Sequence, residues 1–158
     1  MKLVAANRGA VVRNEEEMPG RTNYVIGNDP ARWQTGVSNY AKVVYENVYR
    51  GVDLIYYGNG RELESDFKVA VGANPAAIDL RFDGIKRLRI DASGELVIGT
   101  VAGEARQRKP VAYQVVTGKR REVAARYVLR GKNRVSFGLG RYDHSQPLMI
   151  DPVLVYFP

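Results

Sequence analysis

Cysteine is absent from the 158-residue sequence, and His144 is its single histidine. Disulfides, thiolate metal sites and cysteine nucleophiles are therefore excluded together, as is a metal site built from several histidines of one chain. No run approaches the ~18 apolar residues that span a bilayer, and the first residues hold too short an apolar run for a signal peptide. The sequence therefore predicts a chain without a membrane span.

Helical patterning is also scarce, because no stretch of about fifteen residues keeps its apolar side chains at a 3.6-residue period. Ten Tyr, sixteen Gly and many Val favour strands instead. Apolar residues make up 45% of the chain and charged residues 26%, as in an ordinary soluble domain. At this length we expect one β-rich domain over residues 1–158.

Strand-like runs recur at the spacing of about 8–12 residues that is typical of sandwiches and barrels. We predict an all-β fold, either an antiparallel β-sandwich or a strongly bent sheet of about ten strands, with one or two single-turn helices. Residues 15–20 and 117–121 are expected to form loops, and residues 122–129 one strand. Both ends look cut: residues 2–6 start mid-pattern, and the chain stops while still apolar. We therefore expect an excised part of a larger protein.

The most regular strand follows a turn at residues 58–61. Residues 52–57 and 62–71 are predicted to form a hairpin around this turn. With side chains alternating between faces, one face of the second strand carries Leu63, Ser65, Phe67 and Val69. The opposite face carries Glu62, Glu64, Asp66 and Lys68.

Several longer phrases carry a family resemblance. They are PGRTNYVIGNDP at residues 19–30, followed by Trp33; YRGVDLIYYG at 49–58; LESDFKV at 63–69; GANP at 72–75, followed by Ile78; and PLMIDPVLVY at 147–156. Together they resemble the domain of unknown function that precedes SBBP repeats in large bacterial surface or secreted proteins. Those repeats are named for a seven-bladed β-propeller, and the likeness runs from about residue 2 to residue 156.

The resemblance implies export and a β-rich module at the cell surface or outside the cell. It implies neighbouring propeller repeats of the parent protein as a partner. The family has no established catalytic residues, so the resemblance assigns no catalytic role to any position of this chain.

Acidic side chains are the first candidate site. In the predicted hairpin, Asp53 can approach Glu64 or Asp66 on one sheet face. Clustered carboxylates can bind Ca²⁺, which takes six to eight oxygen ligands, and a carboxylate pair can hydrolyse a glycosidic bond. The alternative is a solvated charged face on which these groups pair with Lys68 or Arg61. Ca²⁺ is the one cofactor that the sequence leaves open.

Basic side chains are the second candidate site, since the net charge is +7. Two basic runs flank one predicted strand, and aromatic residues lie between the charges. The members of this set are Arg106, Arg108, Lys109, Lys119, Arg120, Arg121, Tyr113 and Tyr127. Such a surface fits a cell-surface glycan or another anionic polymer; nucleic acid is not favoured, because no DNA- or RNA-binding motif is present. The alternative is a solvated basic surface.

Three functional hypotheses follow from these observations. The leading one is a non-catalytic extracellular module, structural or adhesive, that supports a neighbouring propeller. The second is a module that binds polysaccharide or another anionic polymer. The third is a carboxylate-dependent glycan hydrolase. His144 lies beside Asp143 and Ser145, but adjacency in sequence is not the geometry of a catalytic triad, so the sequence favours a non-enzyme.

Overall fold

The structure, a computed structural model, describes residues 1–59, 62–152 and 154–155. Extended backbone dominates, with two single-turn 3-10 helices, η1 (Pro30–Arg32) and η2 (Pro75–Ala77). The strands are β1 (Lys2–Leu3), β2 (Val11–Tyr24), β3 (Gln34–Tyr49), β4 (Val52–Asn59), β5 (Glu62–Val69), β6 (Leu80–Arg81), β7 (Arg87–Ile90), β8 (Leu96–Thr100), β9 (Gly103–Gln107), β10 (Val111–Val116), β11 (Lys119–Val123), β12 (Ala125–Leu129), β13 (Arg134–Leu139), β14 (Leu148–Asp151) and β15 (Leu154–Val155). The all-β prediction is confirmed.

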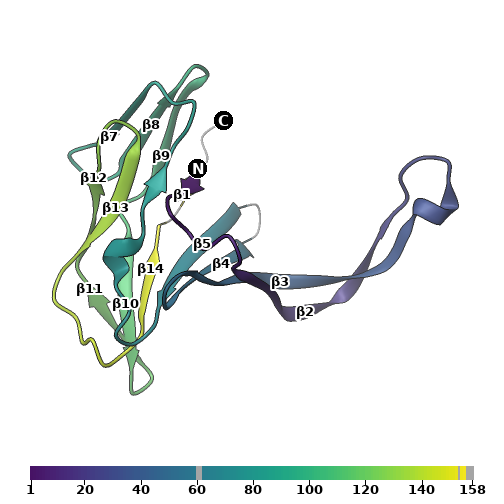
Figure 1. Cartoon of the computed structure of the whole chain (residues 1–158), viewed down its shortest axis with the longest axis horizontal. Helices are drawn as coiled ribbons and strands as arrows, with labels where there is room; N and C mark the ends of the chain where they lie inside the picture. The colour runs from purple at the N-terminus through teal and green to yellow at the C-terminus, as the bar shows by residue number, and fades with distance from the viewer. Residues whose placement is uncertain (60–61, 153, 156–158) are drawn as a thin grey trace.

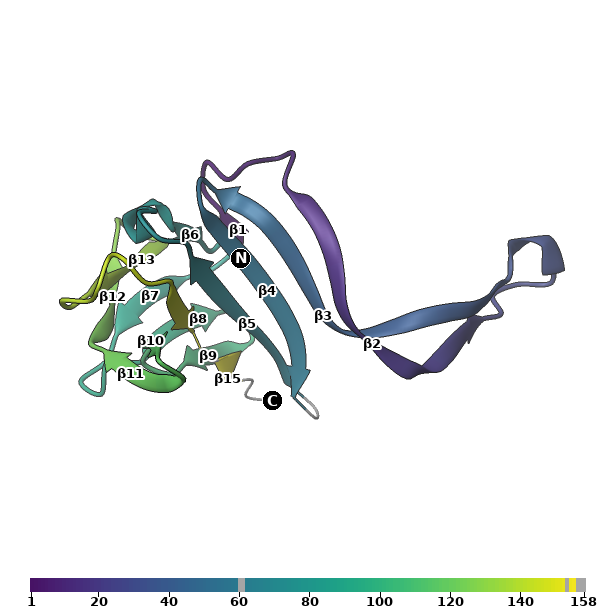
Figure 2. The same ribbon diagram turned by 90° about the horizontal axis from the view of Figure 1, so that it is seen from below.

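Three antiparallel sheets make up the fold (Figures 1 and 2). The largest has the strand order β11-β10-β14-β5-β4-β3-β2, and the two smaller ones have the orders β1-β6-β13-β12 and β15-β9-β8-β7. Buried apolar side chains from all three sheets form a continuous cluster. The large sheet therefore supplies one layer of a sandwich-like body, and the two small sheets cover it from the other side.

The core depends on the alternation predicted for β4 and β5. These strands pair with Val52 opposite Val69 and Leu54 opposite Phe67, and all four side chains are buried. We call the side of the large sheet that carries them its core face, and the opposite side its outer face. The predicted hairpin and the assignment of Phe67 and Val69 to one face are confirmed.

A glycine is required where β3 turns into β4. Gly51 has φ +73°, a conformation that side chains with a Cβ rarely adopt. A Cβ at this position would also lie 2.7 Å from the Cβ of Ala73. The tight turn therefore depends on Gly51 for two separate reasons.

Three local predictions were wrong. Residues 15–20 lie inside β2, because this segment pairs with β3; Glu16 pairs with Lys42 of β3, and Glu17 with Arg21 of β2 itself. Lys119 and Arg121 belong to β11 and not to a loop, and residues 122–129 are divided at Ala124. Over the described residues the strands number fifteen against the expected ten or so, because a change of sheet breaks a continuous apolar run into short pieces.

Both single-turn helices form where Asx-Pro pairs occur. Asp29 accepts a hydrogen bond from the backbone N–H of Ala31 (3.0 Å), and Asn74 accepts one from Ala76 (3.0 Å). Each is followed by a proline, whose missing N–H costs nothing at the first helical position. No helix in the described part of the chain is long and apolar enough to cross a membrane.

The two-layer burial gives the first testable prediction. Leu148→Ala should lower the free energy of unfolding by about 2–5 kcal/mol, because Leu148 is 1% exposed and its loss leaves a cavity between the layers. Leu63→Ala is the matched control: Leu63 is 62% exposed, and its substitution should cost less than about 0.5 kcal/mol. Urea denaturation measures both, and equal losses would contradict the layer assignment.

Candidate functional site

Asp53, the first of the three predicted acidic site residues, is hydrogen-bonded to the backbone. It lies on the outer face opposite Lys68. Its Oδ1 accepts a hydrogen bond from the backbone N–H of Asn47 (2.8 Å), where β3 is irregular and Asn47 has φ +51°. Among the described residues, no group of three or more His, Cys, Asp or Glu side chains is placed to hold a metal ion. The fold therefore does not assemble Asp53, Glu64 and Asp66 into a cation site.

Asp66 instead belongs to an outer-face cluster that the sequence did not reveal. Its Oδ1 accepts a hydrogen bond from the hydroxyl of Tyr57 (3.2 Å). β14 pairs with β5 and brings Asp151 close enough for its charge to act on Asp66. Within the described part of the chain, Asp151 Oδ1 is enclosed and accepts no hydrogen bond. Only tertiary pairing joins positions so distant in sequence.

This environment disfavours ionisation. Burial raises the pKa of Asp66 to about 6, and the negative charges of Asp151 and Glu64 add to the shift, while the Tyr57 hydrogen bond opposes it. Burial likewise raises the pKa of Asp151, with Glu64 contributing. Burial beside other negative charges thus favours the protonated forms of Asp66 and Asp151.

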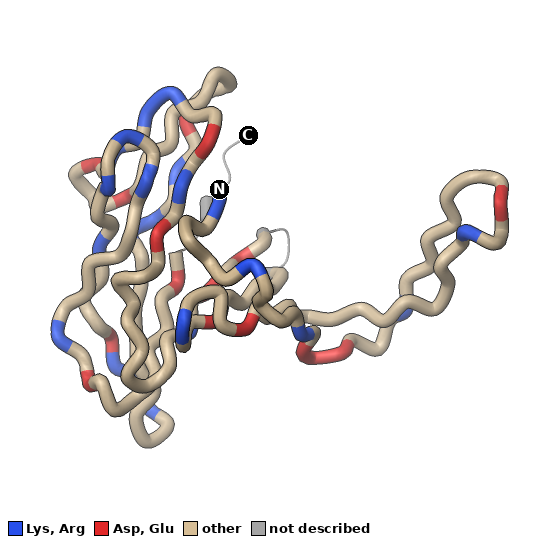
Figure 3. Tube along the Cα trace, in the orientation of Figure 1, with Lys and Arg blue, Asp and Glu red and all other residues tan. Residues whose placement is uncertain are grey.

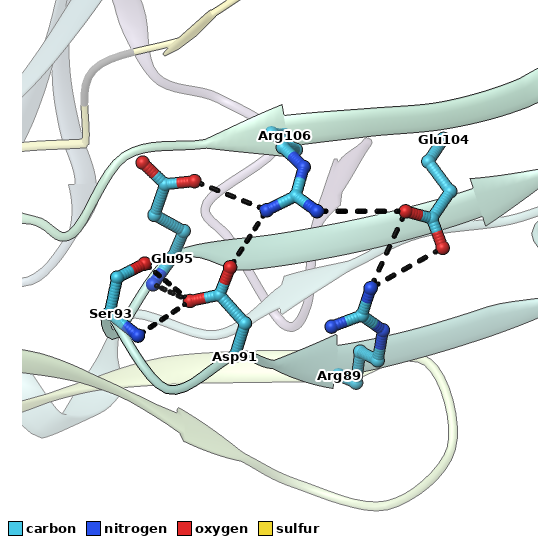
Figure 4. A network of polar contacts seen from close by, with 6 residues as sticks. All are labelled: Arg89, Asp91, Ser93, Glu95, Glu104 and Arg106. Atoms are coloured by element: carbon cyan, nitrogen blue, oxygen red, sulfur yellow. Dashed lines mark hydrogen bonds and ion pairs between the residues drawn. The ribbon is translucent and has the colours of Figure 1, made fainter.

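Arg106, the first of the predicted basic residues, is committed to ion pairs (Figure 4). Its guanidinium lies 2.7 Å from Asp91, 3.3 Å from Glu95 and 3.8 Å from Glu104. Asp91 also accepts hydrogen bonds from Ser93 within the β7–β8 turn, and hydrogen bonding, chiefly from Ser93, lowers its pKa to about 2. Arg106 therefore stabilises this hairpin and has little capacity left for a ligand.

The other basic residues are exposed but do not converge. Lys109 lies beside Ala124, next to the last residue of β11, whereas Lys119 lies at the opposite end of that strand, opposite Val116. Arg108 is exposed as well, before β10 begins. Arg120 and Arg121 follow Lys119 along β11, an edge strand, and their side chains alternate between its faces.

The two aromatic candidates, Tyr113 and Tyr127, lie in different environments. Tyr113 lies under Arg120, whose guanidinium carbon is 3.7 Å from the ring centroid, which is a cation–π contact. Tyr127 is 2% exposed, packs against Phe137, and donates its hydroxyl to the carbonyl of Arg108 (3.0 Å). The prediction that Tyr127 contacts a polymer is wrong, because the ring lies in the core between the layers.

His144 does not take part in a triad. Its ring stacks on Tyr142 with centroids 4.2 Å apart. The carboxylate of Asp143 accepts hydrogen bonds from the N–H (2.9 Å) and the hydroxyl (2.7 Å) of Ser145. These contacts shape a loop, as the sequence predicted.

The most conspicuous feature is a hairpin that projects from the body (Figures 1 and 2). β4 pairs with β3 as far as Lys42, opposite Tyr57; beyond that pair, β2 is the only strand among the described residues that pairs with β3. We call β2, β3 and the loop between them the arm. From Val11 to Val43 none of its residues is buried.

The arm has two chemically different faces. Register with β4 places Val43 beside Tyr56 and Tyr45 beside Leu54, so these side chains continue the core face of the large sheet. Alternation along both strands extends this arm core face, whose members are Val12, Asn14, Met18, Thr22, Val37, Asn39, Ala41, Val43 and Tyr45. The same alternation places Glu16 opposite Ala41, and its carboxylate pairs with Lys42 of the outer face. The core face therefore continues from the body onto the arm, where no described residue covers it.

Charges of the two arm strands pair with one another. Arg13 lies 2.8 Å from Glu46 and 3.4 Å from Glu15. Lys42 pairs with Glu16, and Arg21 with Glu17 (3.3 Å). The arm holds four basic and five acidic residues, so the positive excess of the chain lies on the body (Figure 3). The arm thus offers a partner a nearly neutral surface.

The loop at the tip of the arm exposes several apolar side chains, one of which is held by a hydrogen bond. The indole N–H of Trp33 donates to the carbonyl of Gly27 (3.1 Å), which fixes the ring against the loop. Tyr24, Val25, Ile26 and Trp33 are all exposed there. Alternation from Val37 to Tyr45 was the sequence signal that could have revealed this long ribbon.

The family model for a domain of unknown function, DUF7948, matches residues 1–153. The chain belongs to the DUF7948 family. No curated protein and no solved structure matches this DUF7948 chain. Its function must therefore be argued from its own geometry, in which the arm is the candidate site.

The raised pKa of Asp66 gives the second prediction. In the folded state the carboxyl keeps its proton up to about pH 6, whereas in the unfolded chain it ionises near pH 4. The folded state therefore holds the extra proton, and the free energy of unfolding should fall as pH rises from about 4 to above 6. Asp66→Asn should remove this fall and stabilise the protein at pH 8 by about 1–3 kcal/mol.

Asp151→Asn provides the companion variant, since removing this charge should move the pKa of Asp66 back toward its ordinary value. Urea denaturation between pH 4 and pH 8 measures both variants. A pH profile that Asp66→Asn leaves unchanged would show that Asp66 does not hold a proton in the folded protein.

Proposed function

We propose that this DUF7948 domain is a non-catalytic structural and adhesive module that makes its contacts through the arm. One observation carries the proposal: the largely uncharged core face of the large sheet continues onto the arm and is left uncovered. Sheets in globular proteins bury such faces against a second layer. A partner that covers this face buries its apolar side chains, and the hydrophobic effect then stabilises the complex.

The arm is built for contact and not for folding of the body. Tyr24, Ile26 and Trp33 contribute nothing to the core, yet the Trp33 hydrogen bond and the capped η1 turn hold the tip in one conformation. A preorganised apolar surface loses little conformational entropy when it binds. This feature supports an adhesive role.

The setting that fits this role is the one implied by the resemblance to domains that precede SBBP repeats. We propose that the domain is secreted or displayed on the cell surface and supports a neighbouring β-propeller of its parent protein.

The hydrolase hypothesis gains no support from the acidic residues. Asp53 is occupied by the N–H of Asn47, and Asp66 by the hydroxyl of Tyr57. A glycosidase needs two carboxyl groups aimed at one glycosidic bond, whereas Asp53 lies opposite Lys68 and holds the backbone of β3.

One observation favours a second function, binding of an anionic polymer. Lys119 and Arg121 are exposed on β11, and Arg120 between them is stacked on Tyr113. Stacking fixes the guanidinium in place, so a sulfate or carboxylate on a polymer meets an ordered cation. The candidate residues are Lys119 and Arg121 on one face of the edge strand β11 and Arg120 with Tyr113 on its other face, without Arg106 or Tyr127.

Photo-crosslinking tests the adhesive function. A photo-reactive phenylalanine derivative at Val12 should form a covalent adduct with the partner that covers the arm on the cell, because Val12 lies on the arm core face. The same probe at Val11 is the matched control, since the two neighbours are 52% and 59% exposed but point to opposite faces. Mass spectrometry identifies the adduct. Equal yields at both positions, or none at either, would refute the adhesive function.

Heparin chromatography tests the second function. Lys119→Ser with Arg121→Ser should elute at lower salt and reduce the slope of log affinity against log salt by about 1.5, if each cation displaces one counterion. Lys86→Ser with Arg87→Ser is the control, because it removes two exposed cations from another sheet. If both double variants shift equally, retention reports net charge alone.

A further inference from the structure

We propose that the occupant of the arm core face is a second copy of this chain, with the two arms packed face to face about a two-fold axis. The inference deepens the proposed function, on which it rests, by naming the partner. Two-fold dimers are the commonest soluble assemblies, and they require a surface that is complementary to itself. Charge, size and overall shape of the arm all meet that requirement.

Charge is the first argument. Apart from Tyr45 and Glu16, whose carboxylate pairs with Lys42, the arm core face carries no ionisable side chain, so two copies of it meet with little like-charge repulsion. The charged residues of β2 and β3 lie on the opposite face or, like Glu16, pair with a residue of that face. The arm core face offers little opposite charge to attract a strongly charged partner, whereas an identical apolar ribbon is complementary to it.

Size is the second argument. At about 3.3 Å per residue, the part of β3 from Gln34 to Tyr45 extends for about 40 Å, and a two-stranded ribbon is about 10 Å wide. One face thus measures roughly 400 Å² in plan. Its pleat and the tip loop bring the accessible surface toward the roughly 800 Å² that each partner buries in a standard interface.

Shape is the third argument. The body carries the net positive charge, and the arm projects away from it (Figures 1 and 3). Two arms that overlap in antiparallel fashion place their bodies at opposite ends, several times farther apart than the Debye length of about 8 Å at physiological salt. Arm-to-arm packing therefore joins two basic molecules without bringing their charges together.

An antiparallel overlap also makes the ends of the arm complementary. The tip of one copy, with Ile26 and Trp33, reaches the base of the other. There Tyr45 and Tyr56 form an edge-to-face pair, with ring centroids 5.9 Å apart, on the core face. Aromatic and aliphatic anchors at the two ends give the dimer a fixed register.

Two double variants of the full chain test this inference. Val12→Lys with Val37→Lys places two like charges on the arm core face, whereas Val11→Lys with Ser38→Lys places the same two charges on the outer face. Both variants add the same net charge and use neighbouring positions of the same strands. Sedimentation velocity from about 1 to 500 μM reports the oligomeric state, and circular dichroism confirms that each variant is folded.

We expect a concentration-dependent dimer for the unmodified chain. The outer-face variant should keep it, and the core-face variant should weaken it about 100-fold or more, because a charge buried there has no partner. The single tryptophan, Trp33, supplies a second readout: its emission should shift to shorter wavelength as the dimer forms.

Other results overturn the inference. A monomer at every concentration does so, and so does a dimer that both variants keep or that both lose while folded. Crosslinking from Val12 then separates the two proposals. An adduct with another domain or protein would leave the adhesive function standing with a different partner, whereas no adduct would refute both.

Discussion

The structure depends on the burial of one face of the large sheet. Val52, Leu54, Phe67 and Val69 lie on that face within the body, where the two small sheets cover them. The same face continues through Tyr45 and Val43 onto the arm, where no described residue covers it. Hydrophobic burial of this face therefore stabilises the body, whereas the part of the face on the arm is left exposed. The proposed functions of the arm follow from this change from a covered to an exposed face.

Polar side chains outside the core stabilise the fold in several ways. Asp53 fixes an irregular turn of β3, and Arg106 holds the β7–β8 hairpin through three carboxylates. Asp66 differs from these, because it is enclosed beside other acidic groups and keeps a proton to about pH 6. Charged residues that look alike in composition thus have separate roles, which neighbouring strands decide.

Much of the body could be predicted from alternation and turn residues, whereas the sites could not. The β4–β5 hairpin follows from the pattern around Phe67, and η1 and η2 follow from Asx-Pro pairs. The interpretation of residues 15–20 as a loop failed because three consecutive glutamates look solvated until the backbone pairing with β3 and the ion pairs with Arg13, Arg21 and Lys42 are known. Tyr127 was misplaced because an aromatic residue between basic ones has the same sequence pattern whether its ring faces solvent or the core.

The sequence by itself determined that the chain is extended, which residues alternate within a strand, and where the tight turns occur, because these properties are set by each residue and its immediate neighbours. Only the tertiary structure decided which alternating faces are covered, which carboxylate meets Asp66, and that the arm stands free. Those outcomes depend on strands such as β13 and β14, which lie far along the chain and reach their places only through long-range pairing.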